Sequence, residues 1–336
     1  MIYIYIYPDN NTIGIRPAFF YNLNSNIYKS SNNHVTFELN GGSWKEGSKL
    51  WEEFDAYQGG QKLPDATNII PPDGDTFLGW VIQGENDLIS EIAANQTGDI
   101  VLEAVYGSVW FGTYPQNDKT GVQEEPIKWN ILKRDGDEVL LISDNVLDNV
   151  SYHHQDYTTT PWENSDVRSW LNNSFKNRAF TINQSNNGIA TKSISTLNQN
   201  DTIDSLFLLS YDEADSYFSS DNSRKSKATE YAKNISNNGG KLSTNNGYGD
   251  YWLRTKGFSV SNSAQFVSAN GDLFGSGAHV NNRTIGIRPV LYAKLNSDIF
   301  RLSNNNISFD LNGGSFKKES ALWEKMWSYQ GGQKLP

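Results

Sequence analysis

Two adjacent histidines, His153 and His154, are the residues whose type and spacing most suggest metal chemistry, because Asp148 and Asp156 lie within a few positions of them. Imidazole nitrogens and carboxylate oxygens are ligands that zinc and related ions accept. Neighbouring side chains of an extended strand, however, point to opposite faces, so both rings could reach one ion only from a loop. We therefore interpret the pair as surface histidines and predict neither a metal ion nor a cofactor.

Residues for covalent or acid–base catalysis form no recognisable pattern. The chain has no cysteine, which excludes thiolate nucleophiles, disulfides and Cys-ligated metals. His279 is the only other histidine between residues 107 and 296, and no serine stands in a G-x-S-x-G context. The carboxylates of Glu124 and Glu125 precede Pro126 and are interpreted as part of a solvated loop. The sequence thus predicts no catalytic residue and no enzyme activity.

Residues 248–283 have the chemistry of a recognition surface rather than of a reaction centre. Aromatic, amide and cationic side chains alternate there with Gly, Ser and Asn, which favour turns. Aromatic faces combined with amide donors suit sugars and peptides equally. The predicted ligand-binding residues are Phe258, Asn262, Asn270, Phe274, His279, Asn281, Asn282 and Arg283.

Short strands must position these loops. The apolar segments 251–253, 264–267 and 285–287 are bounded by turn residues and are predicted to be strands. Upstream, residues 161–175 predict a helix capped by Ser165, and Ser210 with Glu213 forms a capping box at the start of the next helix. A weaker third helix is predicted for residues 225–235, and a loop for 237–250.

Large aromatic and arginine side chains within the regular motifs are predicted to be structural. We expect the indoles to lie in the core and the arginines to form buried ion pairs that hold loops in place, with Glu163 or Asp166 as possible partners. The residues concerned are Trp129, Trp162, Trp170, Trp252, Arg168, Arg254 and Arg288.

Composition limits the classes of partner. The 336 residues are enough for more than one domain, and the formal net charge of −10 with scattered basic residues disfavours nucleic acid. No segment approaches the roughly 18 apolar residues of a membrane span. An aromatic content of 13% with many Asn, Ser and Gly residues indicates a β-rich protein with many loops.

A long internal repeat organises the chain. TIGIRPAFFYNLNSNIY, FELNGGSW and YQGGQKLP, starting at Thr12, recur as TIGIRPVLYAKLNSDIF, FDLNGGSF and YQGGQKLP, starting at Thr284, an offset of 272 residues without a gap. Such duplication predicts that the chain is part of a longer array of neighbouring copies. We expect residues 1–30 to be the tail of a preceding copy and 304–336 the truncated start of the next one.

Residues 34–106 are predicted to form a small module. VTFELNGG, FLGW and DIVLEAVY read as strands, and residues 48–57 place four apolar side chains at helical spacing. The order FELNGGSW, YQGGQKLP, FLGW and GDIVLEAVY resembles the internalin-type B repeat of bacterial surface proteins. The resemblance implies a β-grasp-like spacer or adhesion module without catalytic residues.

Residues 107–296 are predicted to form the larger module. Its motifs F-G-x-Y-P-Q, W-x-I-L, L-L-I-S, W-E-N-S-D-x-R-S-W-L, F-L-L-S-x-x-E-A, W-L-R and G-I-R-P resemble an uncharacterised bacterial surface-module family within the group of the C-type-lectin fold. That group includes the formylglycine-generating enzymes, whose chemistry requires the cysteines that this chain lacks. The E-P-N or Q-P-D and W-N-D motifs of calcium-dependent lectins are absent as well.

Together these observations predict an α+β protein with a β-grasp-like small repeat followed by a C-type-lectin-like domain that has a mixed antiparallel sheet and two or three short helices. The expected function is that of a non-enzymatic, adhesin-like protein on the bacterial cell surface, whose export signal and anchor lie outside this sequence. Its expected partner is an unknown protein or carbohydrate ligand. The alternatives are a purely structural spacer array that projects a distal domain, and an uncharacterised enzyme.

Overall fold

The protein is described here from a computed structural model. The described residues are 33–40, 42–71, 77–85, 89–106, 109–135, 138–155, 160–218, 220–235, 240–294, 297, 299–300, 307–326 and 329–336. The predicted tail of a preceding copy, residues 1–30, lies outside this set, as does Asp156.

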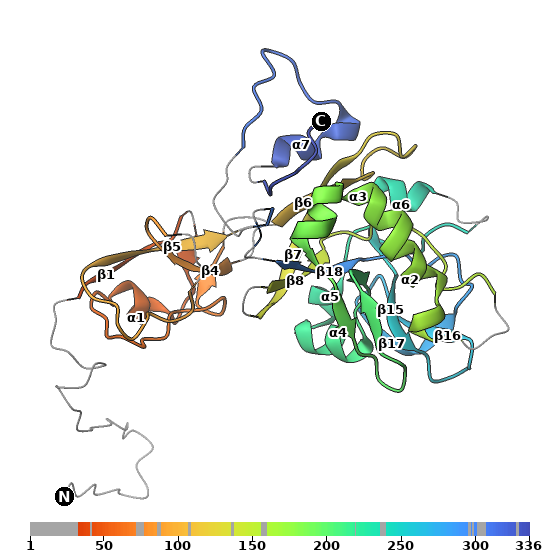
Figure 1. Cartoon of the computed structure of the whole chain (residues 1–336), viewed down its shortest axis with the longest axis horizontal. Helices are drawn as coiled ribbons and strands as arrows, with labels where there is room; N and C mark the ends of the chain where they lie inside the picture. Colours follow the sequence, from red (N-terminus) through yellow and green to blue (C-terminus); the bar gives the residue numbers. More distant parts are fainter. Residues whose placement is uncertain are drawn as a thin grey trace, which may run out of the picture.

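The first unit is a small sheet with its own apolar core. β1 (Val35–Glu38) pairs in parallel with β5 (Ile100–Tyr106), and β4 (Phe77–Ile82) pairs antiparallel with the other edge of β5. β2 (Ser43–Trp44) and β3 (Ile69–Ile70) form a second, two-stranded sheet. The alternating apolar residues of these strands surround the buried Trp80, whose indole N–H donates to the Pro64 carbonyl at 2.8 Å. Figure 1 shows this unit at one end of the molecule.

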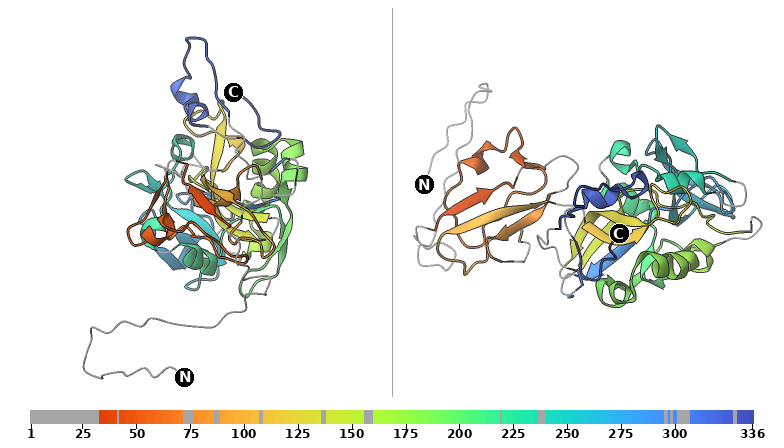
Figure 2. Two further views of the ribbon diagram at one scale, coloured as in Figure 1. Left: turned by 90° about the vertical axis from the view of Figure 1, so that its left-hand side faces the viewer. Right: turned by 90° about the horizontal axis from the view of Figure 1, so that it is seen from above.

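The larger unit is built on a mainly antiparallel sheet. Its strand order is β12 (Leu206–Phe207), β18 (Val290–Lys294), β8 (Glu138–Ser143), β7 (Glu125–Asp135) and β6 (Val109–Tyr114), with β9 (Ile189–Ala190) also paired to β18. Because β18 lies between β8 and β12, the last strand of the larger unit pairs with a strand from its beginning in the same sheet. Seen from above in Figure 2, these elements form a body separate from the small sheet.

Smaller hairpins complete the larger unit. β15 (Tyr251–Lys256), β16 (Ser263–Val267) and β17 (Leu273–His279) form a three-stranded antiparallel sheet. β10 (Lys192–Ile194) pairs with β11 (Thr202–Asp204), and β13 (Thr244–Asn245) pairs with β14 (Tyr248–Gly249). The predicted strands at 251–253 and 264–267 are therefore confirmed, and the loop 237–250 contains a minimal hairpin in its described part.

Helices start where the sequence places their caps. The η1 turn (Trp162–Asn164) leads into α2 (Asp166–Trp170), a π-helical turn (Leu171–Phe175) and α3 (Lys176–Ala179), and Ser165 accepts from the Arg168 amide at 3.3 Å. The Ser210–Glu213 capping box opens α4 (Tyr211–Tyr217), as predicted. The remaining helical segments of this unit are η3 (Gln184–Gly188), α5 (Asp221–Arg224) and α6 (Glu230–Asn234).

Three predicted elements are shorter than the sequence suggested. The helix expected over residues 48–57 is limited to α1 (Lys49–Glu52), with Leu50 in solvent rather than on a buried face. The third helix starts only after the Thr229 cap, because Lys227 pairs with Tyr248 in a β-bridge. Residues 285–287 form isolated bridges to Tyr251 and Asp148 instead of a strand. In each case contacts with distant segments decide where regular structure stops.

The C-terminal segment packs against the larger unit. Its η4 turn (Lys318–Ser320) is followed by α7 (Leu322–Lys325), and Trp323 and Met326 are buried with Trp110 of β6. The Trp323 indole donates to the Glu124 carbonyl at 3.2 Å, and the Leu322 amide donates to the Glu125 carboxylate at 2.9 Å.

The architecture is α+β, with short helices around several mostly antiparallel sheets (Figure 1). Within the described residues, no helix has both the length and the apolar character that a membrane crossing requires.

Candidate functional site

A surface depression of about 500 Å³ lies where two loops of the larger unit meet. One wall is the loop between β10 and β11, and the other is the end of β15 with the loop that leads to β16. This volume falls within the range typical of ligand sites, roughly 300–1,000 Å³. The lining residues are Leu197, Asn198, Gln199, Thr255, Lys256, Gly257, Phe258, Ser259, Val260, Ser261 and Gln265.

Three apolar side chains of this depression are exposed. Phe258 is 79% exposed, Leu197 69% and Val260 44%. A cluster of exposed apolar groups from two separate loops is uncommon, because scattered single residues are the normal pattern of a surface. Amide and hydroxyl groups surround them, and Lys256 is the one charged side chain among the lining residues in the described part of the chain. The depression therefore offers apolar contact area together with neutral hydrogen-bonding groups.

The position of Phe258 depends on Gly275 of the neighbouring strand β17. The Phe258 amide donates to the Gly275 carbonyl at 3.3 Å. A Cβ atom on Gly275 would lie only 2.6 Å from Cε1 of the Phe258 ring, so a larger residue at this position would displace the ring from the strand. The ring thus lies over Gly275 while most of its surface stays in solvent.

Arg254 of β15 holds the β10–β11 loop, which forms the other wall of the depression. It is buried, and its guanidinium donates to the Thr196 hydroxyl (2.9 Å), the Ser195 carbonyl (2.7 Å) and the Leu208 carbonyl (2.7 Å). It also forms a two-oxygen ion pair with Glu213 of α4. One side chain therefore ties the β10–β11 loop to β15 and α4.

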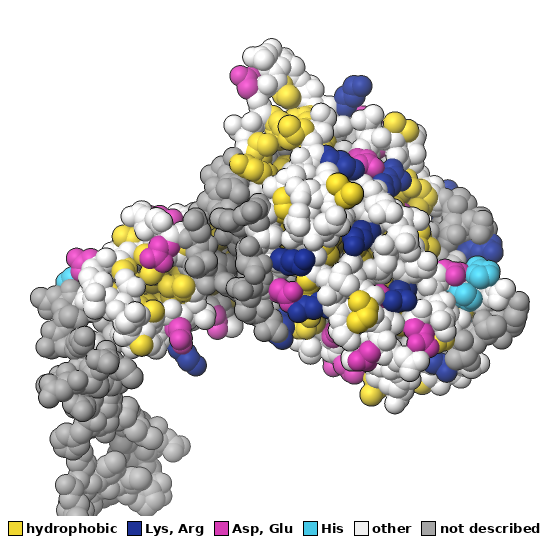
Figure 3. All heavy atoms as spheres, in the orientation of Figure 1, with side chains coloured by type: hydrophobic (Ala, Val, Ile, Leu, Met, Phe, Trp, Pro, Cys, Tyr) yellow, Lys and Arg dark blue, Asp and Glu magenta, His cyan; other side chains and the backbone are white. Residues whose placement is uncertain are grey.

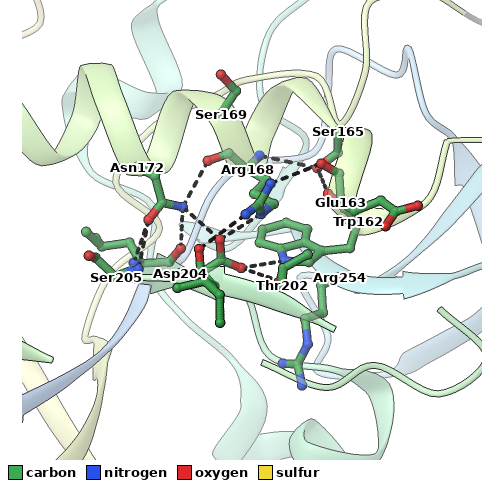
Figure 4. Close-up of polar contacts among 12 residues, drawn as sticks. Trp162, Glu163, Ser165, Arg168, Ser169, Asn172, Thr202, Asp204, Ser205 and Arg254 are labelled. Carbon is green, nitrogen blue, oxygen red and sulfur yellow. Dashed lines mark hydrogen bonds and ion pairs between the residues drawn. The ribbon is translucent and has the colours of Figure 1, made fainter. Parts of the chain in front are cut away.

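Asp204 is a second buried polar centre beneath the same loop (Figure 4). Its carboxylate accepts from Arg168 Nε (2.7 Å), the Trp162 indole (2.9 Å) and the Thr202 hydroxyl (2.6 Å). Gln199, at the rim of the depression, accepts from the Trp162 amide at 2.6 Å. The loop that carries Leu197 is therefore connected to the η1 turn through Gln199, and the strand that follows it, β11, is connected to α2 through the charge-assisted bond of Asp204 with Arg168.

The structure places the eight predicted ligand-binding residues at different parts of the β15–β17 sheet and of the loops beside it. Phe258 alone lines the depression. Phe274 is partly exposed but stacks on Phe266, with ring centroids 4.8 Å apart and an interplanar angle of 11°. Asn270 lies in the β16–β17 turn and accepts from Asn245 at 2.7 Å, at the opposite end of this hairpin from Asn262 and His279.

The other predicted residues form a separate group at the end of β17. Asn262 Nδ2 lies 3.2 Å from His279 Nδ1. Asn282 accepts from both the backbone amide (2.7 Å) and the hydroxyl (2.8 Å) of Thr284, which is a local turn contact, and Asn281 precedes it in the same turn. The Arg283 carbonyl accepts from Asn149 at 3.0 Å. None of these residues lines the depression, although Asn262 directly follows Ser261, which does.

Sequence reasoning missed the wall formed by Leu197, Asn198 and Gln199, together with Val260. The β10–β11 loop lies about sixty positions before Phe258, so no local pattern joins the two. The available signal was Leu197 itself, an isolated apolar residue among Thr196, Asn198 and Gln199, where a turn residue would be expected.

The buried aromatic and arginine residues largely follow the prediction. Trp129, Trp162 and Trp252 are fully buried, and Trp170 packs against the core while partly exposed. Arg168 and Arg254 form ion pairs, but their partners are Asp204 and Glu213 rather than Glu163 or Asp166. Arg288 donates to backbone carbonyls, including that of Ser143 at 2.9 Å, and packs on the Tyr251 ring.

The interpretation of Glu125 as a solvated loop residue was wrong. Glu125 is fully buried at the start of β7, where it accepts from the Asn117 amide at 2.8 Å, so it is not a solvated loop residue. Asp148 is also buried and bonds to the Tyr114 hydroxyl and to the Asn149 amide (2.6 Å), not to the histidine pair. Loss of hydration raises the pKa of Asp148 to about 6, although hydrogen bonds from Tyr114 and Asn149 and the charge of Arg178 oppose this shift.

Asp148 predicts a distinctive pH dependence of stability. Its folded pKa lies above the unfolded value, so the stabilisation is complete below about pH 4 and is lost as pH rises to about 6, on the order of 2–3 kcal/mol. We expect the difference in unfolding free energy between the parent and Asp148→Asn to shrink by this amount from pH 4 to pH 7, measured by urea denaturation. A difference that is independent of pH would contradict the shift. Other carboxylates, such as Asp118 with its lowered pKa, contribute equally to both proteins and cancel.

The structure thus defines an α+β protein whose larger unit carries a partly apolar depression above two buried polar centres. Residues 136–295, which include every lining residue of that depression, match the family model described as "Domain of unknown function (DUF6273)". Neither the curated proteins nor the solved structures gave a significant match to the chain.

Proposed function

We propose that residues 107–296 form a non-enzymatic recognition module that binds a protein or glycan ligand at the depression around Phe258. The observation that carries this proposal is the exposed apolar cluster of Phe258, Leu197 and Val260. Leu197 stands on a loop that Arg254 holds through Ser195 and Thr196, and the Phe258 amide bonds to the Gly275 carbonyl, so both walls are partly preorganised. Preorganised loops lose less conformational entropy on binding, which favours affinity.

The chemistry of the depression suits a neutral or weakly anionic ligand. An exposed aromatic face contacts the apolar side of a sugar ring or of a peptide side chain, while the amides of Asn198 and Gln199 supply donors and acceptors. Lys256 adds one cation. This composition resembles the aromatic and small polar mixture of binding loops in general, which is why both ligand classes are tested.

We further propose that the protein acts on the bacterial cell surface, with residues 34–106 as an internalin-type B repeat of β-grasp-like fold and 107–296 as a C-type-lectin-like module. The sequence motifs and the repeat offset of 272 residues support this arrangement. The parallel pairing of β1 with β5 and the short helix α1 are compatible with a β-grasp-like fold of residues 34–106. Neighbouring copies in the same array are the expected partners of the chain ends.

The binding proposal is tested by removing the apolar cluster. We expect a triple variant, Phe258→Ala, Leu197→Ser and Val260→Ser, to lose at least tenfold in affinity, because each exposed side chain contributes apolar contact area of the order of 1 kcal/mol. Binding is measured on a glycan array and on an array of host surface proteins. The matched control is Ile182→Ser, which removes an apolar side chain of similar exposure (80%) elsewhere in the same unit. Equal binding by the triple variant and the control would remove the assigned site.

The alternative function is that of a structural spacer. It is favoured by the packing of Trp323 and Met326 of the C-terminal segment on Trp110, which gives the larger unit a buried contact with the sequence that follows it. A parent protein that binds neither array, while remaining folded, would favour the spacer over the recognition module.

A further inference from the structure

The histidine pair adopts the arrangement that an extended strand would forbid. His153 and His154 lie outside any strand, and their ring centroids are 4.5 Å apart with an interplanar angle of 52°. Asp166, the first residue of α2, faces both rings: one oxygen lies 3.2 Å from His153 Nδ1 and the other 2.6 Å from His154 Nδ1. The candidate ligand atoms of the three residues all lie within 4.8 Å of one another.

The backbone around this group is held in place on both sides. The His153 amide donates to the Val280 carbonyl at 2.8 Å, and the His154 amide donates to Asp166 Oδ2 at 2.7 Å. The preceding residue, Tyr152, is buried and donates from its hydroxyl to the Arg254 carbonyl at 2.9 Å. The backbone that carries the two histidines is therefore positioned by the fold.

The distances suit an ion of the zinc type. With zinc–nitrogen and zinc–oxygen bonds of about 2.0–2.2 Å and tetrahedral angles, two ligand atoms on one ion are separated by about 3.3 Å. The 3.2 Å between His153 Nδ1 and Asp166 already has this value. The 2.6 Å between His154 Nδ1 and the other Asp166 oxygen is shorter than this value, so the His154 side chain must move outward to bind the same ion. It is 65% exposed and has room to do so.

One nitrogen of the group, Nδ1 of His153, has no hydrogen-bond partner among the described residues. Among the described residues, Nδ1 of His153 is shielded from solvent and has no hydrogen bond of acceptable geometry, although the Asp166 carboxylate is near. An imidazole nitrogen that is buried without a partner costs free energy unless a proton shared with the carboxylate or a metal ion satisfies it. A metal ion would satisfy this nitrogen, the His154 nitrogen and the carboxylate together.

We propose that His153, His154 and Asp166 bind one Zn²⁺ ion, or a related divalent transition-metal ion, at the surface of the larger unit. Two imidazoles and one carboxylate favour zinc, nickel, cobalt or copper over calcium and magnesium, which prefer oxygen ligands. Three protein ligands leave a position for water or for a group of a bound partner. Figure 3 shows histidine side chains at one edge of the larger unit beside an acidic side chain, where such an ion is accessible. None of the three residues lines the proposed ligand depression.

The test uses the full chain without a histidine tag, freed of metal with a chelator that is then removed. Zinc chloride is titrated into the parent by isothermal calorimetry, and we expect one ion per chain. His154→Ala and Asp166→Asn are each expected to weaken zinc binding by more than about 100-fold, beyond the 10–100-fold effect of losing an outer-shell partner. Circular dichroism confirms that each variant is folded. The chain has four histidines, and His34→Ala, in the small unit, is the matched control, expected to stay within about twofold of the parent.

A second measurement identifies the ligands directly. Cobalt(II) added to the parent is expected to give a visible d–d absorption that zinc displaces and that Asp166→Asn abolishes. The proposal is overturned if the parent binds no zinc at one-to-one stoichiometry. It is equally overturned if zinc binding survives in His154→Ala and Asp166→Asn but is lost in a His279→Ala variant.

Discussion

Replacing Asp204 by alanine is expected to lower the free energy of unfolding of the larger unit by about 3–5 kcal/mol. The carboxylate is completely buried and accepts from Arg168, Trp162 and Thr202 at 2.6–2.9 Å. Alanine leaves the buried Trp162 indole N–H and the buried Thr202 hydroxyl without this acceptor, and it removes the ion-pair partner of Arg168. The cost of unpaired buried groups exceeds the net value of the hydrogen bonds themselves, which is why a large effect follows from one small substitution.

The control for Asp204 is Glu163→Ala in the same cluster. The Glu163 carboxylate bonds only to the exposed Asn200 among the described contacts (2.8 Å), while its backbone carbonyl keeps the bond from Arg168. We expect a change within about 0.5 kcal/mol. Stability is measured by urea denaturation followed by fluorescence, with hydrogen exchange of the α2 amides to locate the loss. If Asp204→Ala and Glu163→Ala are equally stable, Asp204 is not the centre of the network.

Arg254→Met is expected to have the second large effect, about 3 kcal/mol, together with weaker ligand binding. Methionine keeps much of the aliphatic volume but removes every donor that the guanidinium directs to Ser195, Thr196, Leu208 and Glu213. The acceptors on the β10–β11 loop are left without a partner. Because Leu197 follows Thr196 directly, loosening this loop disturbs the wall of the depression even though Arg254 does not line it.

A double-mutant cycle with Glu213→Gln separates the ion pair from the other contacts of Arg254. The coupling energy is expected to be smaller than the total effect, since the backbone carbonyls of Ser195 and Leu208 lose their donor in either background. Lys119→Met is the matched control: its ion pair with Glu230 spans 3.8 Å between exposed side chains and should contribute less than about 0.5 kcal/mol. A loss below about 1 kcal/mol for Arg254→Met would show that the loop is held by other contacts.

The stability predictions for Asp204 and Arg254 and the binding experiment all concern the depression around Phe258. Phe258, Leu197 and Val260 are exposed, so their replacement is expected to change binding and leave stability nearly unchanged. Arg254 and Asp204 are buried, so their replacement is expected to change stability first and binding as a consequence. A variant set with this pattern separates contact with the ligand from support of the loops.

Local signals in the sequence were enough for several elements. The Ser165 and Ser210 caps, the strands at 251–253 and 264–267, and the burial of Trp129 and Trp252 depend on a residue and its near neighbours, and the structure has all of them. The helix predicted over residues 48–57 failed for the opposite reason. Its side chains Trp51 and Phe54 do pack on Phe37, but α1 ends at Glu52 because Ala56 pairs with the distant His34 in a β-bridge.

The candidate sites depend on contacts between distant segments even more than the helices and strands do. The sequence by itself determined that aromatic and amide residues stand on loops between short strands, that thiol chemistry is excluded, and that histidines 153 and 154 are adjacent. Only the tertiary structure decided that Leu197 meets Phe258, that His279 and Asn270 lie at opposite ends of a hairpin, and that Asp166 rather than Asp148 faces the histidine pair. The physical reason is range: caps, turns and alternation follow from interactions over a few residues, whereas a binding surface requires side chains from segments that only the packing of the core brings together.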